Sequence, residues 1–93
     1  MSSKAVLKRY AAMQEMTATV YRKYETPGSQ NVLLDTPENR KEIAELIRPL
    51  AELGRTDRWK GNVEAWASAV EDNKNTLGWA FLQYSVYTGY AAE

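Results

Sequence analysis

Residues 3–24 read SKAVLKRYAAMQEMTATVYRKY, and this stretch decides the fold class. Ser2 or Ser3 is suited to cap a helix that begins here, and no Gly or Pro follows before Pro27. Apolar side chains recur at intervals of three and four residues, which is typical of an amphipathic helix with one buried face. The stripe consists of Val6, Tyr10, Met13, Thr17, Val20 and Tyr24, and it is widened by Leu7, Met16 and Tyr21. The sequence therefore predicts a long first helix.

The segment that follows, residues 25–35, is predicted to be a connection. Pro27-Gly28-Ser29-Gln30 has the composition of a turn. The short apolar run after it, residues 32–34, has no second strand to pair with, and a lone strand is not stable. We therefore expect a loop in which Val32, Leu33 or Leu34 closes one end of the core.

A second helix is predicted to begin at Asp35-Thr36-Pro37-Glu38, which supplies a capping side chain, a Pro in the first turn and an acid near the positive helix end. Its buried stripe would contain Ile43, Leu46, Ile47, Leu50 and Leu53, and Gly54 suits the position after its end. Pro49 lies inside this segment. Because proline lacks a backbone donor and clashes one turn back, we expect a kink or break near residues 45–48.

Two helices rich in Trp and Tyr are predicted in the remainder. Thr56-Asp57 is suited to start a third helix that ends near Asp72, with Trp59, Val63, Trp66 and Val70 on one face and Gly61 as a weak point. Residues 72–75 form a turn, and the last helix runs from about residue 76 to 90. The fold class is therefore all-α: a compact antiparallel bundle of about four helices, in one domain spanning residues 1–93.

Composition excludes several kinds of chemistry. The 93 residues contain no Cys and no His, so disulfides, thiolate metal sites, catalytic thiols and imidazole bases are all excluded. Twelve basic residues balance twelve acidic ones, whereas a nucleic-acid coat needs a strong field of one sign. No phosphate-binding glycine loop occurs, and the turn after Glu71 lacks the Gly and final Glu of a calcium loop. We expect no metal, no cofactor and no enzymatic activity.

The start of the chain and its apolar runs bear on location. Lys8 and Arg9 interrupt the first apolar run, so it does not resemble a signal segment. The longest apolar-rich run, residues 77–90, is shorter than a membrane span and contains polar side chains. The sequence therefore favours a cytoplasmic protein without a membrane segment.

The last predicted helix has two opposed apolar arcs. At about 100° per residue, Leu77, Phe81, Tyr84 and Thr88 lie on one arc, and Trp79, Leu82, Val86 and Tyr90 lie nearly opposite. Either this helix is central and covered on all sides, or one face packs in the core and the other docks a second chain, in a homo-oligomer or with a different protein. A strand that pairs with a partner's edge is a weaker alternative, because the alternation of apolar and polar residues is poor. The arcs alone leave open which face would be exposed. As contact residues we predict Trp79, Val86 and Tyr90, with Trp59 as an outlier, because Trp and Tyr are enriched at interfaces.

Charge is unevenly distributed along the chain. Residues 1–24 carry five basic side chains against one acidic, and residues 61–93 carry one basic against four acidic. The simplest explanation of this uneven charge is that the charged helix faces are exposed to solvent. The charge asymmetry is also suited to orient a partner or a second copy of the chain. An alternative function is binding of nucleic acid or nucleotide by the first helix, with Lys4, Lys8, Arg9, Arg22 and Lys23 as candidate anion contacts.

These observations favour a small non-enzymatic helical interaction module: an accessory subunit, adaptor or inhibitor that binds a protein partner through an aromatic helix face. The two-faced last helix and the long first helix also predict self-association as a homodimer or higher assembly.

Overall fold

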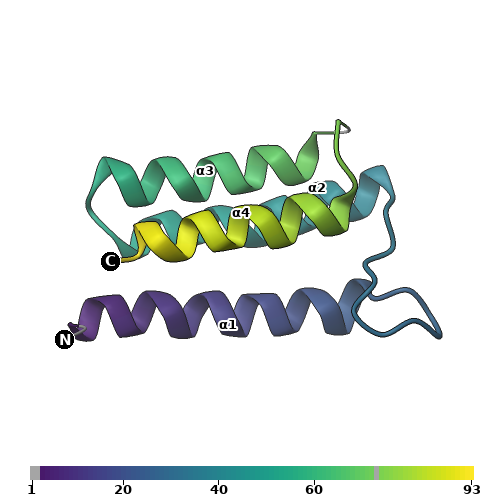
Figure 1. Cartoon of the computed structure of the whole chain (residues 1–93), viewed down its shortest axis with the longest axis horizontal. Helices are drawn as coiled ribbons and strands as arrows, with labels where there is room; N and C mark the ends of the chain where they lie inside the picture. The colour runs from purple at the N-terminus through teal and green to yellow at the C-terminus, as the bar shows by residue number, and fades with distance from the viewer. Residues whose placement is uncertain (1–2, 73) are drawn as a thin grey trace.

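The computed structural model describes residues 3–72 and 74–93, which fold into four α-helices and one 3₁₀ helix (Figure 1). The elements are α1 Lys4–Tyr24, α2 Pro37–Ile47, η1 Arg48–Leu53, α3 Asp57–Glu71 and α4 Leu77–Ala91. The described residues form no strand; a single bridge pairs Glu25 with Leu33. The all-α prediction is therefore confirmed.

Each α-helix begins at a hydroxyl side chain that caps the first turn. Ser3, Thr36, Thr56 and Thr76 each accept a hydrogen bond from the backbone N–H three residues further on, at 3.1–3.3 Å. Such caps satisfy donors that have no partner within the helix. Ser3 therefore takes the capping role predicted for it or for Ser2, and Ser2 lies outside the described residues. The predicted turn at residues 72–75 includes Asn73, which also lies outside them.

Pro49 ends the second helix where the sequence predicted a break. The α-helical hydrogen bonding of α2 stops at Ile47, and the chain continues from Arg48 as the 3₁₀ helix η1. Gly54 follows η1 and lies against the Trp59 ring, where a Cβ atom would overlap the indole. Glycine is thus needed at this position for close approach rather than for an unusual backbone angle.

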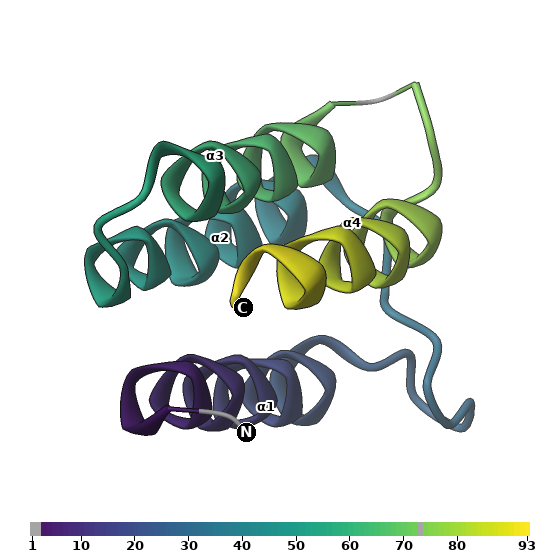
Figure 2. The ribbon, with the colours of Figure 1, turned by 60° about the vertical axis from the view of Figure 1, so that its left-hand side comes forward.

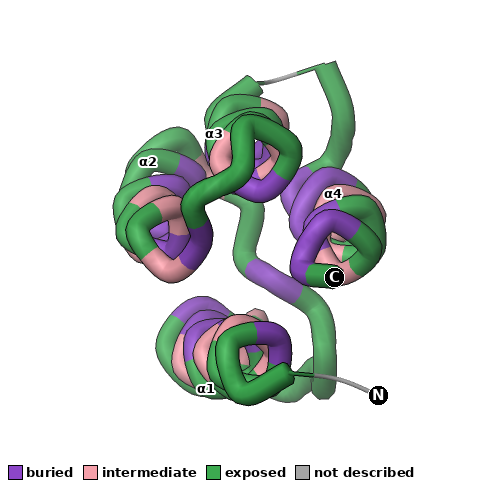
Figure 3. The backbone as a smooth tube through the Cα atoms, turned by 90° about the vertical axis from the view of Figure 1, so that its left-hand side faces the viewer, coloured by how far each residue is buried: buried purple, intermediate pink, exposed green. Residues whose placement is uncertain are grey.

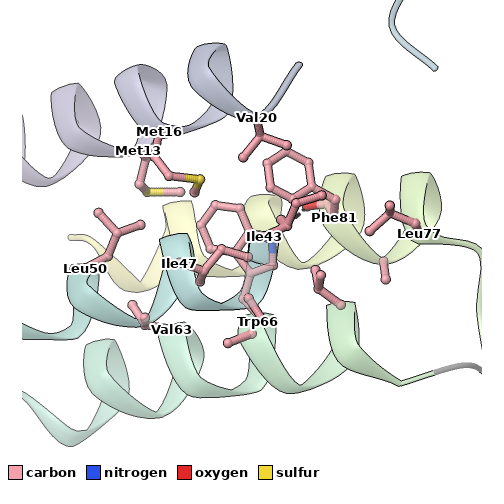
Figure 4. Close-up of a cluster of buried hydrophobic side chains, with 14 of the residues drawn as sticks. Met13, Met16, Val20, Ile43, Ile47, Leu50, Val63, Trp66, Leu77 and Phe81 are labelled. Carbon is pink, nitrogen blue, oxygen red and sulfur yellow. Dashed lines mark hydrogen bonds between the residues drawn. The ribbon is translucent and has the colours of Figure 1, made fainter. Parts of the chain in front are cut away.

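The four α-helices form an up-and-down bundle around one core. Helices that follow one another along the chain run in opposite directions (Figure 1), and the buried sides of all four point inward (Figure 3). Helices α2, α3 and α4 lie together, whereas α1 lies along one side of them (Figure 2). Figure 4 shows Met13, Met16 and Val20 of α1 reaching towards side chains of the other three helices. This arrangement confirms the compact antiparallel bundle.

Two aromatic rings dominate the centre of the core. Trp66 of α3 and Phe81 of α4 are almost completely buried, with ring centroids 5.4 Å apart. The Trp66 Nε1–H donates to the Phe81 carbonyl oxygen at 3.0 Å, so its polar atom is satisfied inside the core. Tyr21 of α1 meets Phe81 edge to face at 5.8 Å. These contacts fix which side of α4 faces inward.

The loop between α1 and α2 closes one end of the core with a single side chain. Leu33 is buried, whereas its neighbours Val32 and Leu34 are about half exposed. The Leu34 N–H donates to the Tyr24 carbonyl oxygen at 2.8 Å, and Gly28 has a positive φ of 81° within the turn. The predicted loop that plugs the core is therefore present, with Leu33 as the plug.

A buried arginine joins the second, third and fourth helices. The Arg40 side chain donates to both carboxylate oxygens of Asp35, from Nε at 2.7 Å and from Nη2 at 3.0 Å. It also donates to the carbonyl oxygens of Val70, Asp72 and Asn75 at the end of α3 and the turn after it. Asp35 in turn accepts from the Leu77 N–H at 3.1 Å, at the start of α4. This network holds the α3–α4 turn on the start of α2.

Candidate functional site

The structure decides which arc of α4 faces the core. Leu77, Phe81 and Thr88 are buried and Tyr84 is half-buried, so this arc packs inward. The opposite side is exposed, with relative accessibilities of 49% for Trp79, 62% for Leu82, 46% for Val86, 46% for Tyr87 and 65% for Tyr90. We call these five side chains the α4 outer face. The alternative of a fully covered last helix is thus excluded for the chain by itself.

The α4 outer face is unusual because its helix has no charge. No Asp, Glu, Lys or Arg occurs from Leu77 to Ala91, whereas an exposed helix normally carries charged residues on its solvent side. Sequence reasoning placed Leu82 on this arc and missed Tyr87. The signal that could have found it is its position three residues before Tyr90, since residues three apart are neighbours on one side of a helix. The Tyr87 hydroxyl accepts a hydrogen bond from the Gln83 side-chain amide at 3.0 Å.

Contacts between aromatic rings hold part of the α4 outer face in place. Tyr84 lies between Trp79 and Tyr87 and meets both rings edge to face, at centroid distances of 6.4 and 5.4 Å. Rings fixed in this way lose little freedom when a second surface covers them, so less of the binding free energy is offset by ordering. The surface is therefore partly organised before any contact forms.

A groove between α1 and α4 adjoins this surface. It has a volume of about 650 Å³ and is lined by Tyr10, Met13, Gln14, Thr17, Ala18 and Ser85. The Ser85 hydroxyl donates to the Leu82 carbonyl oxygen at 2.6 Å, which satisfies it within α4. The lining contains no charged side chain, and it combines the apolar Met13 and Ala18 with four residues that carry a hydroxyl or amide group.

Two interactions between α1 and α4 bracket the groove. Arg9 donates to the Ala92 carbonyl oxygen from Nε at 3.0 Å and from Nη2 at 2.7 Å, near the end of α4. Towards the other end, Tyr21 packs on Phe81. A smaller hollow of about 270 Å³ lies on the other flank of α1, against Leu46 of α2.

Trp59 does not belong to the exposed surface. It is 1% exposed, and its Nε1–H donates to the Leu50 carbonyl oxygen at 2.9 Å. The assignment of Trp59 to the contact surface is therefore corrected: the ring fills the core beside Gly54. Trp79, Val86 and Tyr90 are exposed, and their role in binding a partner stays a prediction.

The predicted basic contacts separate into two groups. Arg9 is held inside the fold, because its Nη1 also donates to the Leu53 carbonyl oxygen at 3.2 Å and its guanidinium lies over the Trp59 ring. It is thus removed from the candidate anion contacts.

The other four basic residues, Lys4, Lys8, Arg22 and Lys23, are exposed on α1. Lys8 and Arg22 are 14 residues apart, which is about 21 Å along a helix. The exposed basic side chains therefore form two separate pairs near the ends of α1, with Glu15 between them.

The pKa values of Asp35 and Tyr24 are shifted by structural contacts. Hydrogen bonds from Arg40 lower the pKa of Asp35, against the effect of partial burial. Burial, and then the hydrogen bond to Glu42 at 2.8 Å, raises the pKa of Tyr24, which ties the end of α1 to α2. Within residues 3–72 and 74–93, no three or more Asp or Glu side chains converge as metal ligands do.

Across the part of the chain that the structure describes, no helix is both long and apolar enough to cross a membrane. No protein-family model, curated protein or solved structure matches the chain significantly.

Proposed function

We propose that this chain is a small non-enzymatic module that binds a protein partner through the α4 outer face. The observation that carries the proposal is an exposed helix side made of Trp79, Leu82, Val86, Tyr87 and Tyr90 on a helix without charge. An exposed apolar patch of this kind marks a contact surface, since its burial removes apolar area from water. The proposal includes action in the cytoplasm, with binding itself as the activity.

The internal contacts of α4 support this proposal. The bundle uses the opposite side of the helix, where Phe81 packs on Trp66 and Thr88 donates to the Tyr84 carbonyl oxygen at 2.8 Å. The outer side chains are therefore not required to fill the core. An exposed apolar surface that folding does not need is best accounted for by contact with a second surface.

Site-specific photocrosslinking tests the proposal. A photoreactive phenylalanine analogue replaces Tyr90 in one variant and Glu45, which is exposed on α2, in a matched control. In cells that make the protein, we expect specific crosslinked products from position 90 and none from position 45. Adding Trp79→Glu to the Tyr90 variant should abolish them. Equal crosslinking from both positions, or no effect of Trp79→Glu, would contradict the proposal.

The alternative of nucleic-acid binding is less well supported, because Arg9 is engaged internally and the other basic residues are divided between the ends of α1. Binding by these residues should weaken steeply with salt and be lost on Lys8→Glu. If the chain binds a protein partner instead, adding it to an oligonucleotide at low salt should leave the electrophoretic mobility of the oligonucleotide unchanged.

A further inference from the structure

We propose that the α4 outer face is the contact between two copies of this chain, packed antiparallel about a two-fold axis that crosses between the helices at the level of residue 84. This inference rests on the proposed function, because it names the occupant of the same surface. Three features support a second copy: the absence of charge, the order of the side chains and the position of two glycines. The area available then sets how tightly two copies would bind.

The absence of charge suits a surface that meets itself. In a two-fold contact each patch faces an identical patch, so any cluster of one sign would be repelled by its copy. The helix from Leu77 to Ala91 has no charged residue, and two copies can meet along its whole length without such repulsion. A partner selected by charge would find nothing on α4 to recognise.

The order of side chains makes the face self-complementary. In an antiparallel helix pair, residues equally far before and after the centre lie at the same height. With the centre at residue 84, Leu82 of one copy is level with Val86 of the other. Trp79 of one copy and Tyr90 of the other lie at the same height to within one residue, which is about 1.5 Å along the helix axis. Aliphatic side chains therefore meet in the middle, and aromatic rings meet at both ends.

Two glycines border the face where the copies would approach most closely. Gly78 and Gly89 are also nearly level in the antiparallel pair, about 100° around the helix from Trp79 and Tyr90, on the flank beside Leu82. A Cβ atom at either glycine would meet nothing within 4 Å in the chain itself. Glycine lowers helix stability relative to alanine, and here the fold gives no packing reason for it. Close contact with a second backbone supplies one.

The area of these side chains lies below that of the smallest stable interfaces, and it fits a weak, transient dimer. An aromatic side chain contributes about 150–250 Å² when fully buried, so the exposed fractions of Trp79, Tyr87 and Tyr90 present about 240–400 Å². Leu82 and Val86 add roughly 100 Å². Two copies would thus bury about 700–1,000 Å² from these side chains, against about 1,200 Å² for the smallest stable interfaces. We therefore expect a reversible dimer that depends on concentration.

The first experiment measures absolute mass by light scattering at two concentrations about a hundredfold apart. The chain has a mass of 10.6 kDa, and the mass should approach twice this value at the higher concentration. Leu82→Glu and Val86→Lys should each give a monomer with an unchanged helical spectrum, because a charge then faces an apolar side chain of the copy. Ala65→Glu, at an exposed position of α3, is the matched control and should still dimerise.

Mixing the two monomeric variants tests the register. In a mixed pair, the L82E carboxylate lies level with the V86K ammonium, whereas the other level pair keeps the native Leu and Val. We expect the mixture to recover the dimer that neither variant forms alone. A native dimer combined with no recovery on mixing would overturn the antiparallel register, and a dimer that survives Leu82→Glu would overturn the choice of surface.

Failure of this inference and failure of the proposed function give different results. A native chain that stays monomeric at the higher concentration overturns self-association. If position 90 then still crosslinks to other proteins and Trp79→Glu abolishes this, the proposed function stands. If crosslinking is also absent, both are wrong.

Discussion

Replacing Arg40 by methionine should cause a large loss of stability. The side chain is 5% exposed, and it donates to Asp35 and to three carbonyl oxygens. Removing one member of a buried ion pair costs about 3–5 kcal/mol. Because the Asp35 side chain is 42% exposed and water can reach it, we take the lower end, about 3 kcal/mol.

This loss converts into a measurable shift of the melting temperature. For a domain of this size, about 1 kcal/mol shifts Tm by roughly 4–8 °C, so Arg40→Met should lower Tm by about 12–24 °C. Arg40→Lys should lose roughly half as much, because an ammonium group keeps the charge but cannot form the planar fork to Asp35. Thermal unfolding followed by circular dichroism at neutral pH provides the measurement.

A matched control is the next residue, Lys41, which is exposed. Lys41→Met should change stability by less than about 0.5 kcal/mol. The cycle of Arg40→Met and Asp35→Asn should show coupling, since the two side chains share one network. A loss below about 1 kcal/mol for Arg40→Met would refute the role assigned to this network.

Three further predictions concern single positions. Gly54→Ala should destabilise the fold by about 1–3 kcal/mol, because its Cβ would lie 2.8 Å from Cγ of Trp59; urea unfolding measures this loss. Gly89→Ala and Gly61→Ala should each raise Tm slightly, since both sites have open space, but light scattering should show weaker dimerisation for Gly89→Ala alone. The pKa of Asp35 is lowered from 3.8, so its carboxylate stabilises the fold above that pH, and this contribution is lost as the pH falls through the folded-state pKa. The stability difference between the native chain and Asp35→Asn should therefore narrow on acidification below about pH 4, as measured by urea unfolding at several pH values.

The helices could be predicted from the sequence because their signals are local. A hydroxyl cap, an apolar stripe with helical spacing and Pro49 each act within a few residues of the chain. These signals gave the four helices and the break between α2 and η1. The side of α4 that faces solvent is different, because both arcs are apolar and the packing of α1 and α3 makes the choice.

Long-range contacts explain the remaining errors. Trp59 and Trp79 look alike in sequence, yet the first ring packs against Gly54 and donates to the Leu50 carbonyl oxygen, whereas the second is 49% exposed. Lys8 and Arg9 are adjacent, but the register of α1 brings Arg9 to the Ala92 carbonyl and leaves Lys8 in solvent. Arg40 likewise resembles a surface residue until α3 closes over it.

The division of α4 into two sides makes folding and binding separable by mutation. Its inner side is held by Phe81 against Trp66 and by the hydroxyl of Thr88, which is buried and satisfied within the helix. Substitution there should unfold the bundle, since the buried area is lost. Val86 lies on the outer side, where a polar side chain meets water in the isolated chain. A loss of association on substitution at Val86, with the melting temperature retained at a concentration where the native chain is monomeric, would therefore report on the contact itself and not on the fold.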